Sequence, residues 1–253
     1  MDMNYILAKV FNNATYATTF LVGKLYINPL AFFGIGDCYD PHEDVTNKYR
    51  GDMDEGLKSY IPSELIAPSD SAYNFFKDIG AVPHKDVAVG ELDTRFLNKN
   101  IMSLFALYYD SENEAFMAPS KQMLNFDEKQ VGTTIIIHDV QEFLRRISFA
   151  LTNTLGSPFW FAYGLIDYCL SLDGRYECAE FSKALEYKWQ QEFRIAIDLG
   201  TSDFKVNSNR IEYDSKSGAI IIDIGDITDI AFSLPTLDFI DSCGGFHTPT
   251  LAS

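Results

Sequence analysis

Residues Phe181–Ile197 read FSKALEYKWQQEFRIAI, and this stretch decides the fold prediction. From Glu192 onward, polar or small residues alternate with large apolar residues, which is the pattern of a β-strand. Glu192 and Arg194 would then point to one face of the strand, and Phe193 and Ile195 to the other. A strand with a carboxylate and a guanidinium on one face either ties the sheet to a neighbouring element or lines a cleft.

The composition indicates a folded globular chain. Of the 253 residues, 47% are hydrophobic and 14% are aromatic, which excludes an intrinsically disordered protein. A chain of this length buries about 70–75% of its unfolded surface and needs no disulfide or metal to fold.

The charge is strongly negative. Twenty Lys and Arg residues stand against 36 Asp and Glu residues, so the formal net charge is −16. Such a surface repels nucleic-acid phosphates, and we expect no direct nucleic-acid binding. The acidity either keeps an aromatic-rich protein in solution or imitates DNA in the groove of another protein.

Cysteine and histidine spacing predicts neither a disulfide framework nor a metal site. The cysteines show no C-x-x-C pair, as expected for reduced thiols, and the histidines lack zinc-site spacing. No apolar run reaches about 18 residues, and the first residues lack the pattern of a signal peptide. We therefore expect a cytoplasmic protein without a membrane span. The residues concerned are Cys38, Cys169, Cys178, Cys243, His42, His84, His138 and His247.

Hydrophobic periodicity predicts many strands and few helices. One helix is expected over Ala14–Val22, ended by Gly23. A second starts at Asp139, whose pairing with Glu142 resembles a capping box, and continues with a stripe of Phe143, Ile147, Ala150 and Leu151. A turn with a short helix capped by Asp226 is expected in IGDITDIA. Strands are expected at Tyr5–Val10, Lys24–Asn28, Val87–Leu92, Ile101–Tyr109, Thr133–His138, Phe159–Tyr168, Glu192–Ile197, Arg210–Tyr213, Ala219–Ile224 and Ala231–Leu234.

This element order predicts an α+β fold with a mainly antiparallel, twisted sheet and a few flanking helices. We expect a single α+β domain over residues 1–240 and a polar C-terminal tail over residues 241–253. No glycine-rich phosphate loop follows any predicted strand, which argues against P-loop and dinucleotide-binding proteins.

The opening stretch also carries a motif, F-x-K-x-x-x-Y-x-x-Q-x-E-x-R. It resembles a family of uncharacterised bacterial and phage proteins, as do the segments GKLYINPLAFF, Arg50–Gly56 and IGDITDIA. The family has no settled activity, so the resemblance implies site residues and not a reaction. The matching residues are Phe181, Lys183, Tyr187, Gln190 or Gln191, Glu192 and Arg194. We expect Arg50, Asp52, Glu55, Lys183, Glu192 and Arg194 to converge on one cleft, with Gln191 as a further candidate.

A second resemblance is to ADP-ribosyltransferase folds, because a strand, a helix and a strand open the chain and an acidic residue arrives late on a strand. The resemblance implies NAD as cofactor and an unknown acceptor. Glu192 would be catalytic, stabilising the oxocarbenium-like charge on the ribose. Tyr5, Lys9, Arg50 and Arg194 would bind the cofactor.

Other hypotheses remain open on the same residues. Glu192 and Arg194 could form a structural ion pair. Carboxylates at Asp52, Asp54 and Glu55, or at Asp223, Asp226 and Asp229, could hold a cation or belong to solvated turns. Lys183, Glu186 and Lys188 with Asp167 resemble a nuclease pattern at poor spacing. The competing functional class is a non-enzymatic acidic interaction protein, such as a phage-encoded counter-defence inhibitor or a DNA mimic with a protein partner. The sequence predicts no oligomeric state.

Overall fold

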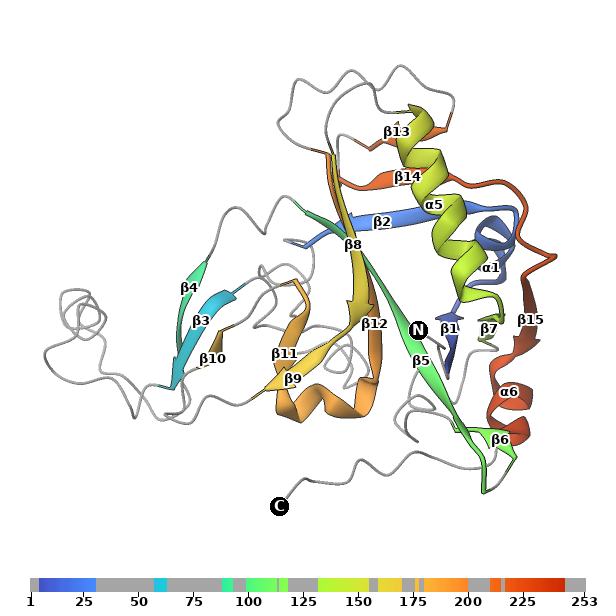
Figure 1. Ribbon diagram of the computed structural model, residues 1–253, viewed down its shortest axis with the longest axis horizontal. Coiled ribbons are helices and arrows are strands. Elements are labelled where there is room, and N and C mark those ends of the chain that lie inside the picture. The colour runs from blue at the N-terminus through green and yellow to red at the C-terminus, as the bar shows by residue number, and fades with distance from the viewer. Residues whose placement is uncertain are drawn as a thin grey trace, which may run out of the picture.

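A computed structural model describes residues 5–30, 57–62, 88–92, 99–112, 114–117, 132–154, 159–169, 176–177, 180–199, 210–214 and 217–243 (Figure 1). These residues form an α+β fold with a mainly antiparallel sheet and a few helices, which confirms the predicted class. The helices are α1 (Ala14–Leu21), α5 (Val140–Thr154), α6 (Thr236–Ser242) and the 3₁₀ helix η4 (Leu185–Gln190).

Within the described ranges, ten strands form the main sheet and five form two smaller sheets. The main-sheet strands are β1 (Tyr5–Phe11), β2 (Lys24–Pro29), β5 (Asn100–Asp110), β6 (Ala115–Phe116), β7 (Thr133–Ile137), β8 (Trp160–Leu165), β12 (Glu192–Asp198), β13 (Ile211–Tyr213), β14 (Ile220–Asp223) and β15 (Ala231–Pro235). The smaller sheets are β10–β3–β4 and β11–β9, made by β3 (Leu57–Pro62), β4 (Ala88–Leu92), β9 (Asp167–Cys169), β10 (Tyr176–Glu177) and β11 (Ser182–Ala184).

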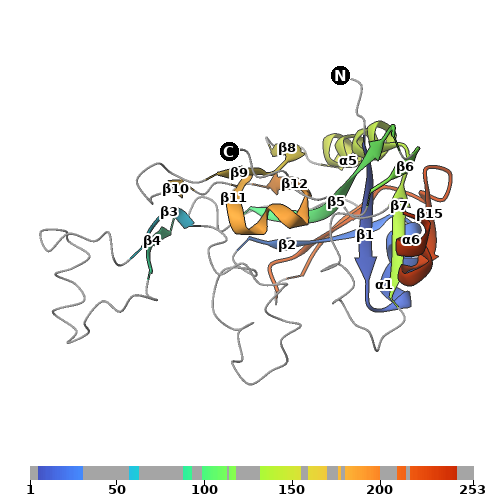
Figure 2. The same cartoon turned by 90° about the horizontal axis from the view of Figure 1, so that it is seen from below.

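The long strand β5 organises the main sheet. Strand β1 pairs with its second half, β2 pairs with its first residues, and β12 pairs with its other edge. Beyond β1 follow β7 and β15, beyond β2 follow β14 and β13, and beyond β12 lies β8. The sheet β10–β3–β4 lies on the side of the molecule away from α1 and α6 (Figures 1 and 2). No helix within the described ranges is long and apolar enough to cross a membrane.

Each face of the sheet has its own apolar core. Leu7 and Phe193 belong to the face that packs against α1 and α5, which we call the α5 face. Ala8 lies on the opposite face, where Phe239 of α6 covers it. Because side chains alternate along a strand, the register places Glu192 on the opposite face too, since it pairs with Phe105, the partner of Ala8.

Helix α5 forms as the sequence predicts. Asp139 Oδ1 accepts a hydrogen bond from the Glu142 amide at 2.9 Å, and the predicted stripe of Phe143, Ile147, Ala150 and Leu151 is fully buried. The Glu142 carboxylate binds Arg145 and Arg146. Helix α1 ends at Leu21, and Gly23 follows its C-cap residue Val22, in the position predicted to terminate the helix. Gly23 has a φ of +86°, and a Cβ there would lie 1.8 Å from the Gly225 carbonyl oxygen, so glycine is required.

Two local predictions were wrong, and one helix was missed. IGDITDIA contains a turn and no helix, because the Asp226 side chain accepts bonds from the amide and hydroxyl of Thr228 and so makes its own turn. The predicted strand Phe159–Tyr168 is divided into β8 and β9 at Ile166, whose amide bonds to the Glu192 carbonyl. Helix α6 was not predicted; it follows β15 directly and places Phe239 in the core.

Candidate functional site

The last part of the stretch Phe181–Ile197 forms a fully buried strand. Strand β12 lies between β5 and β8, and residues 192–197 are buried on both faces. Arg194 is 1% exposed and Glu192 is 5% exposed, which is rare for charged side chains unless they are paired.

The Glu192 carboxylate has a partner on each oxygen. Arg194 Nε donates to Oε1 at 2.7 Å, and the Ser103 hydroxyl donates to the same oxygen. Lys183 Nζ lies 2.9 Å from Oε2 and also donates to Gln190 Oε1 at 3.0 Å. We call Ser103, Lys183, Gln190, Glu192 and Arg194 the Glu192 cluster. Three donors therefore compensate the burial of one carboxylate.

The segment before β12 builds this cluster. Strand β11 carries Lys183, and η4 returns the chain so that Gln190 reaches the same amine. Arg194 Nη1 donates to the Glu180 carbonyl at 2.8 Å, which fastens this segment to the sheet. Gln191 has a φ of +42°, an uncommon value for a residue other than glycine, at the point where the chain turns from η4 into β12.

Electrostatics keep Glu192 ionised. Burial alone would raise its pKa, but the charges of Arg194 and Lys183 together outweigh burial and hold the pKa of Glu192 well below its ordinary value. Tyr168, whose hydroxyl accepts from the Glu192 amide at 2.9 Å, stays neutral because burial raises the pKa of its phenol.

Lys9 approaches the cluster from β1. Its Nζ donates to the Ser103 carbonyl at 2.8 Å, in the part of β5 between its pairing with β1 and its pairing with β2. Burial lowers the pKa of Lys9 to about 8, although Glu192 acts in the other direction. The amine therefore provides a hydrogen bond to a backbone carbonyl of β5 that lies between the residues paired with β1 and those paired with β2.

The structure brings some predicted site residues together and separates others. Lys183 and Arg194 both contact the Glu192 carboxylate. Gln191 precedes Glu192 in the chain, and Lys9 donates a hydrogen bond to the backbone carbonyl of Ser103. Tyr5 lies on the α5 face, where its ring contacts Phe193 at 6.0 Å between centroids, and is thus across the sheet from the Glu192 carboxylate. Arg50, Asp52 and Glu55 lie outside the described residues, so their convergence with Glu192 stays a prediction.

A small cavity of about 310 Å³ borders the cluster. Its lining includes Glu192, Gln191, Tyr168 and Lys188. The Gln191 amide oxygen is buried, and no donor among the described residues bonds to it. An unsatisfied buried acceptor of this kind is costly and marks a place where a ligand or water could bind.

A larger hollow, which the sequence did not reveal, lies on the α5 face. We call it the α5 groove; its volume is about 1000 Å³. One wall is α5, and the other wall and the floor come from β8, β12 and β1. In the sequence, the sign of this hollow is the spacing of Phe161 and Tyr163, which places two aromatic rings on the same face of a strand. The α5 wall includes Gln141, Arg145, Ser148, Phe149 and Thr152, and the floor includes Tyr5, Phe161, Tyr163 and Phe193.

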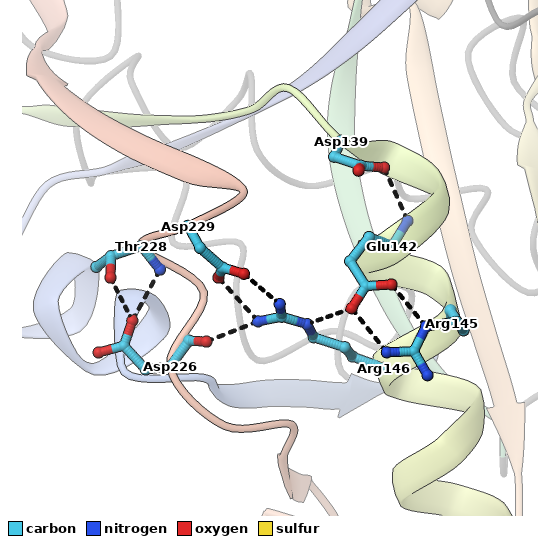
Figure 3. A network of polar contacts seen from close by, with 7 residues as sticks. All are labelled: Asp139, Glu142, Arg145, Arg146, Asp226, Thr228 and Asp229. Atoms are coloured by element: carbon cyan, nitrogen blue, oxygen red, sulfur yellow. Dashed lines mark hydrogen bonds and ion pairs between the residues drawn. The ribbon is translucent and has the colours of Figure 1, made fainter.

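A second ionic network fastens α5 to the turn before β15 (Figure 3). Arg146 binds Glu142 through Nε at 2.8 Å, the Asp226 carbonyl at 2.7 Å and both carboxylate oxygens of Asp229. Asp229 is thus engaged by a guanidinium. Within the described residues, no group of three or more His, Cys, Asp or Glu side chains is placed to hold a metal ion.

Comparisons with known proteins identify no relative. No family model matches the chain, and searches of curated proteins and of solved structures return no match.

Proposed function

We propose that this chain acts by binding a partner molecule, and that the Glu192 cluster stabilises the fold instead of performing chemistry. The observation that carries this proposal is the state of the Glu192 carboxylate. It is 5% exposed, and Arg194, Ser103 and Lys183 occupy its two oxygens.

Catalysis on a ribose would require a different environment for this carboxylate. It would need an oxygen facing the substrate, to accept a bond from a hydroxyl and to stabilise the developing positive charge. The two cations beside Glu192 already use its negative charge, and they would repel an oxocarbenium-like centre.

The charge of the whole chain supports a binding role. A net charge of −16 attracts basic surfaces and speeds association with them. The partner that this surface fits best is therefore a protein with a basic face, including one that normally holds nucleic acid. An acidic interaction protein, acting as an inhibitor or as a DNA mimic, is the function we favour.

An ADP-ribosyltransferase-like activity is the second candidate, and one observation favours it. Glu192 borders the 310 Å³ cavity together with Tyr168 and with Gln191, whose buried amide oxygen accepts no hydrogen bond from the part of the chain that the structure describes. A cofactor hydroxyl or amide entering this cavity would satisfy that oxygen.

Incubation with NAD separates the two candidates. We expect the wild-type chain to release no nicotinamide above the background rate and to show no heat of NAD binding by calorimetry. Nicotinamide release that falls by about 10²-fold or more in Glu192→Gln would contradict the binding proposal, because that variant keeps the shape of the side chain and removes its charge. Circular dichroism of both proteins must first show that the variant is folded.

A further inference from the structure

The floor of the α5 groove is a row of aromatic rings that crosses the sheet from strand to strand. Tyr5 on β1 contacts Phe193 on β12 with 6.0 Å between ring centroids, and Phe193 contacts Tyr163 on β8 at 6.2 Å. Tyr163 contacts Phe161 at 5.5 Å. Phe193 is 1% exposed and lies beneath its neighbours, so the apolar ring surface of the floor comes from Tyr5, Phe161 and Tyr163.

Two of the aromatic rings in this groove are unusually exposed. Tyr163 is 51% exposed and Phe149, on the α5 wall, is 52% exposed. A single exposed aromatic side chain is ordinary, but two of them lining one concave surface above a row of partly buried rings are typical of a binding surface.

The polar groups of the groove are mainly neutral and can donate hydrogen bonds. Burial, with a smaller contribution from Tyr163, raises the pKa of Tyr5, so its phenol is protonated at neutral pH. Gln141, Ser148 and Thr152 add amide and hydroxyl donors from α5. No carboxylate lines the groove among the described residues, and Arg145, its one cation there, is paired with Glu142.

We infer that the α5 groove binds a proline-rich segment of the partner in the polyproline II conformation. Pyrrolidine rings pack flat on aromatic faces, and aromatic-lined grooves are the usual receptors for such segments. A polyproline II chain has no internal hydrogen bonds, so its carbonyls accept bonds from phenols, hydroxyls and amides. Proline has no N–H, so this ligand does not require a carboxylate or any other acceptor from the groove. The inference rests on the proposed binding function and names its partner class.

Charge and shape favour this occupant over three others. A single-stranded nucleic acid would also stack on the rings, but the net charge of −16 opposes its phosphates. A second copy of the chain carries the same charge. An amphipathic helix would place its apolar stripe against a wall on which the polar residues Gln141, Arg145, Ser148 and Thr152 outnumber the apolar ones. Basic residues flanking the proline-rich segment would complement the acidic surface.

The test uses a decaproline peptide with an arginine at each end, titrated into the full chain and followed by calorimetry. We expect saturable binding that weakens about 10-fold or more in Tyr163→Ala and in Phe149→Ala. Tyr163→Phe keeps the ring and should weaken binding by about 5-fold, the effect of one lost hydrogen bond. The matched control is Tyr213→Ala on β13, because Tyr213 is 59% exposed and lies outside the groove.

Several results would overturn the inference. These are absence of peptide binding, or equal binding by wild type and Tyr163→Ala. Tyr163-dependent binding of oligothymidylate or of a helical peptide in place of decaproline would assign the groove to another ligand. Self-association in the ultracentrifuge that Tyr163→Ala removes would assign it to a second copy. If the peptide fails and NAD is not turned over, only this inference falls; NAD turnover that depends on Glu192 removes the proposed function itself.

Discussion

The two faces of β12 differ although the residues alternate along a single strand. On one face, Glu192 and Arg194 are buried in a cluster in which each charge is paired. On the other, Phe193 is buried beneath an open groove that Tyr163 and Phe149 line with exposed rings. We call the face with the buried charged residues the closed face, and the α5 face with its exposed aromatic rings the open face. The charged residues that stand out in the sequence thus have a structural role here, whereas the surface open to a partner is formed by aromatic residues that do not stand out.

The largest effect expected from this contrast is on stability. Glu192→Ala removes the common partner of Arg194 and Lys183 and leaves two buried cations without their carboxylate, so we expect a loss of about 3–5 kcal/mol of unfolding free energy. Urea denaturation followed by circular dichroism measures it. Glu142→Ala is the control, because Glu142 also binds two guanidinium groups but is 25% exposed, and its loss should cost much less unfolding free energy than that of Glu192. Equal stability of Glu192→Ala and wild type would refute the structural role of the cluster.

The second-largest effect is expected at acid pH, where protonation of Glu192 should lower the unfolding free energy. The folded pKa of Glu192 lies below its ordinary value of 4.5, so the stability that its charge contributes is present above that value and is lost as the pH falls below it. Between about pH 5 and about pH 3 we therefore expect wild type to lose more unfolding free energy than Glu192→Gln, which cannot be protonated in this range. Parallel slopes for the two proteins would show that the carboxylate is not stabilised by its neighbours.

The sequence predicted one half of this comparison and missed the other for a physical reason. Alternation along β12 was sufficient to place Glu192 and Arg194 on the same face, and the spacing from Asp139 was sufficient to predict α5. The position of Tyr5 depends on the register through which β5 joins β1 to β12, and that register is set by pairing between segments about 100 residues apart. The α5 groove is assembled from α5, β8, β12 and β1, so the local alternation of Phe161 and Tyr163 indicates an aromatic strand face but not the groove.

A smaller effect should appear at alkaline pH through Lys9. Its pKa is lowered to about 8 in the folded chain from an ordinary 10.5, so the folded state releases this proton first. The destabilisation from burying the charge is fully present below about pH 8 and is relieved as the pH rises toward 10.5. We expect the unfolding free energy of wild type to rise from about pH 8 to about pH 9.5 relative to that of Lys9→Met. The window stops there because tyrosines begin to ionise above it. A lysine with an ordinary pKa would give no difference between the two proteins.

The smallest effect on stability is expected on the open face, where Tyr163→Ala should change the unfolding free energy by about 1 kcal/mol or less. The side chain is 51% exposed, so its removal leaves little new cavity, and the cost is limited to its ring contacts with Phe161 and Phe193. Phe193→Ala is the informative partner variant: it removes a 1% exposed ring from the same row and should cost about 3–5 kcal/mol. Denaturation of both variants under one set of conditions measures the difference. A loss of several kcal/mol in Tyr163→Ala would mean that the exposed ring supports the fold, and the contrast between a closed face that holds the structure and an open face available for binding would fail.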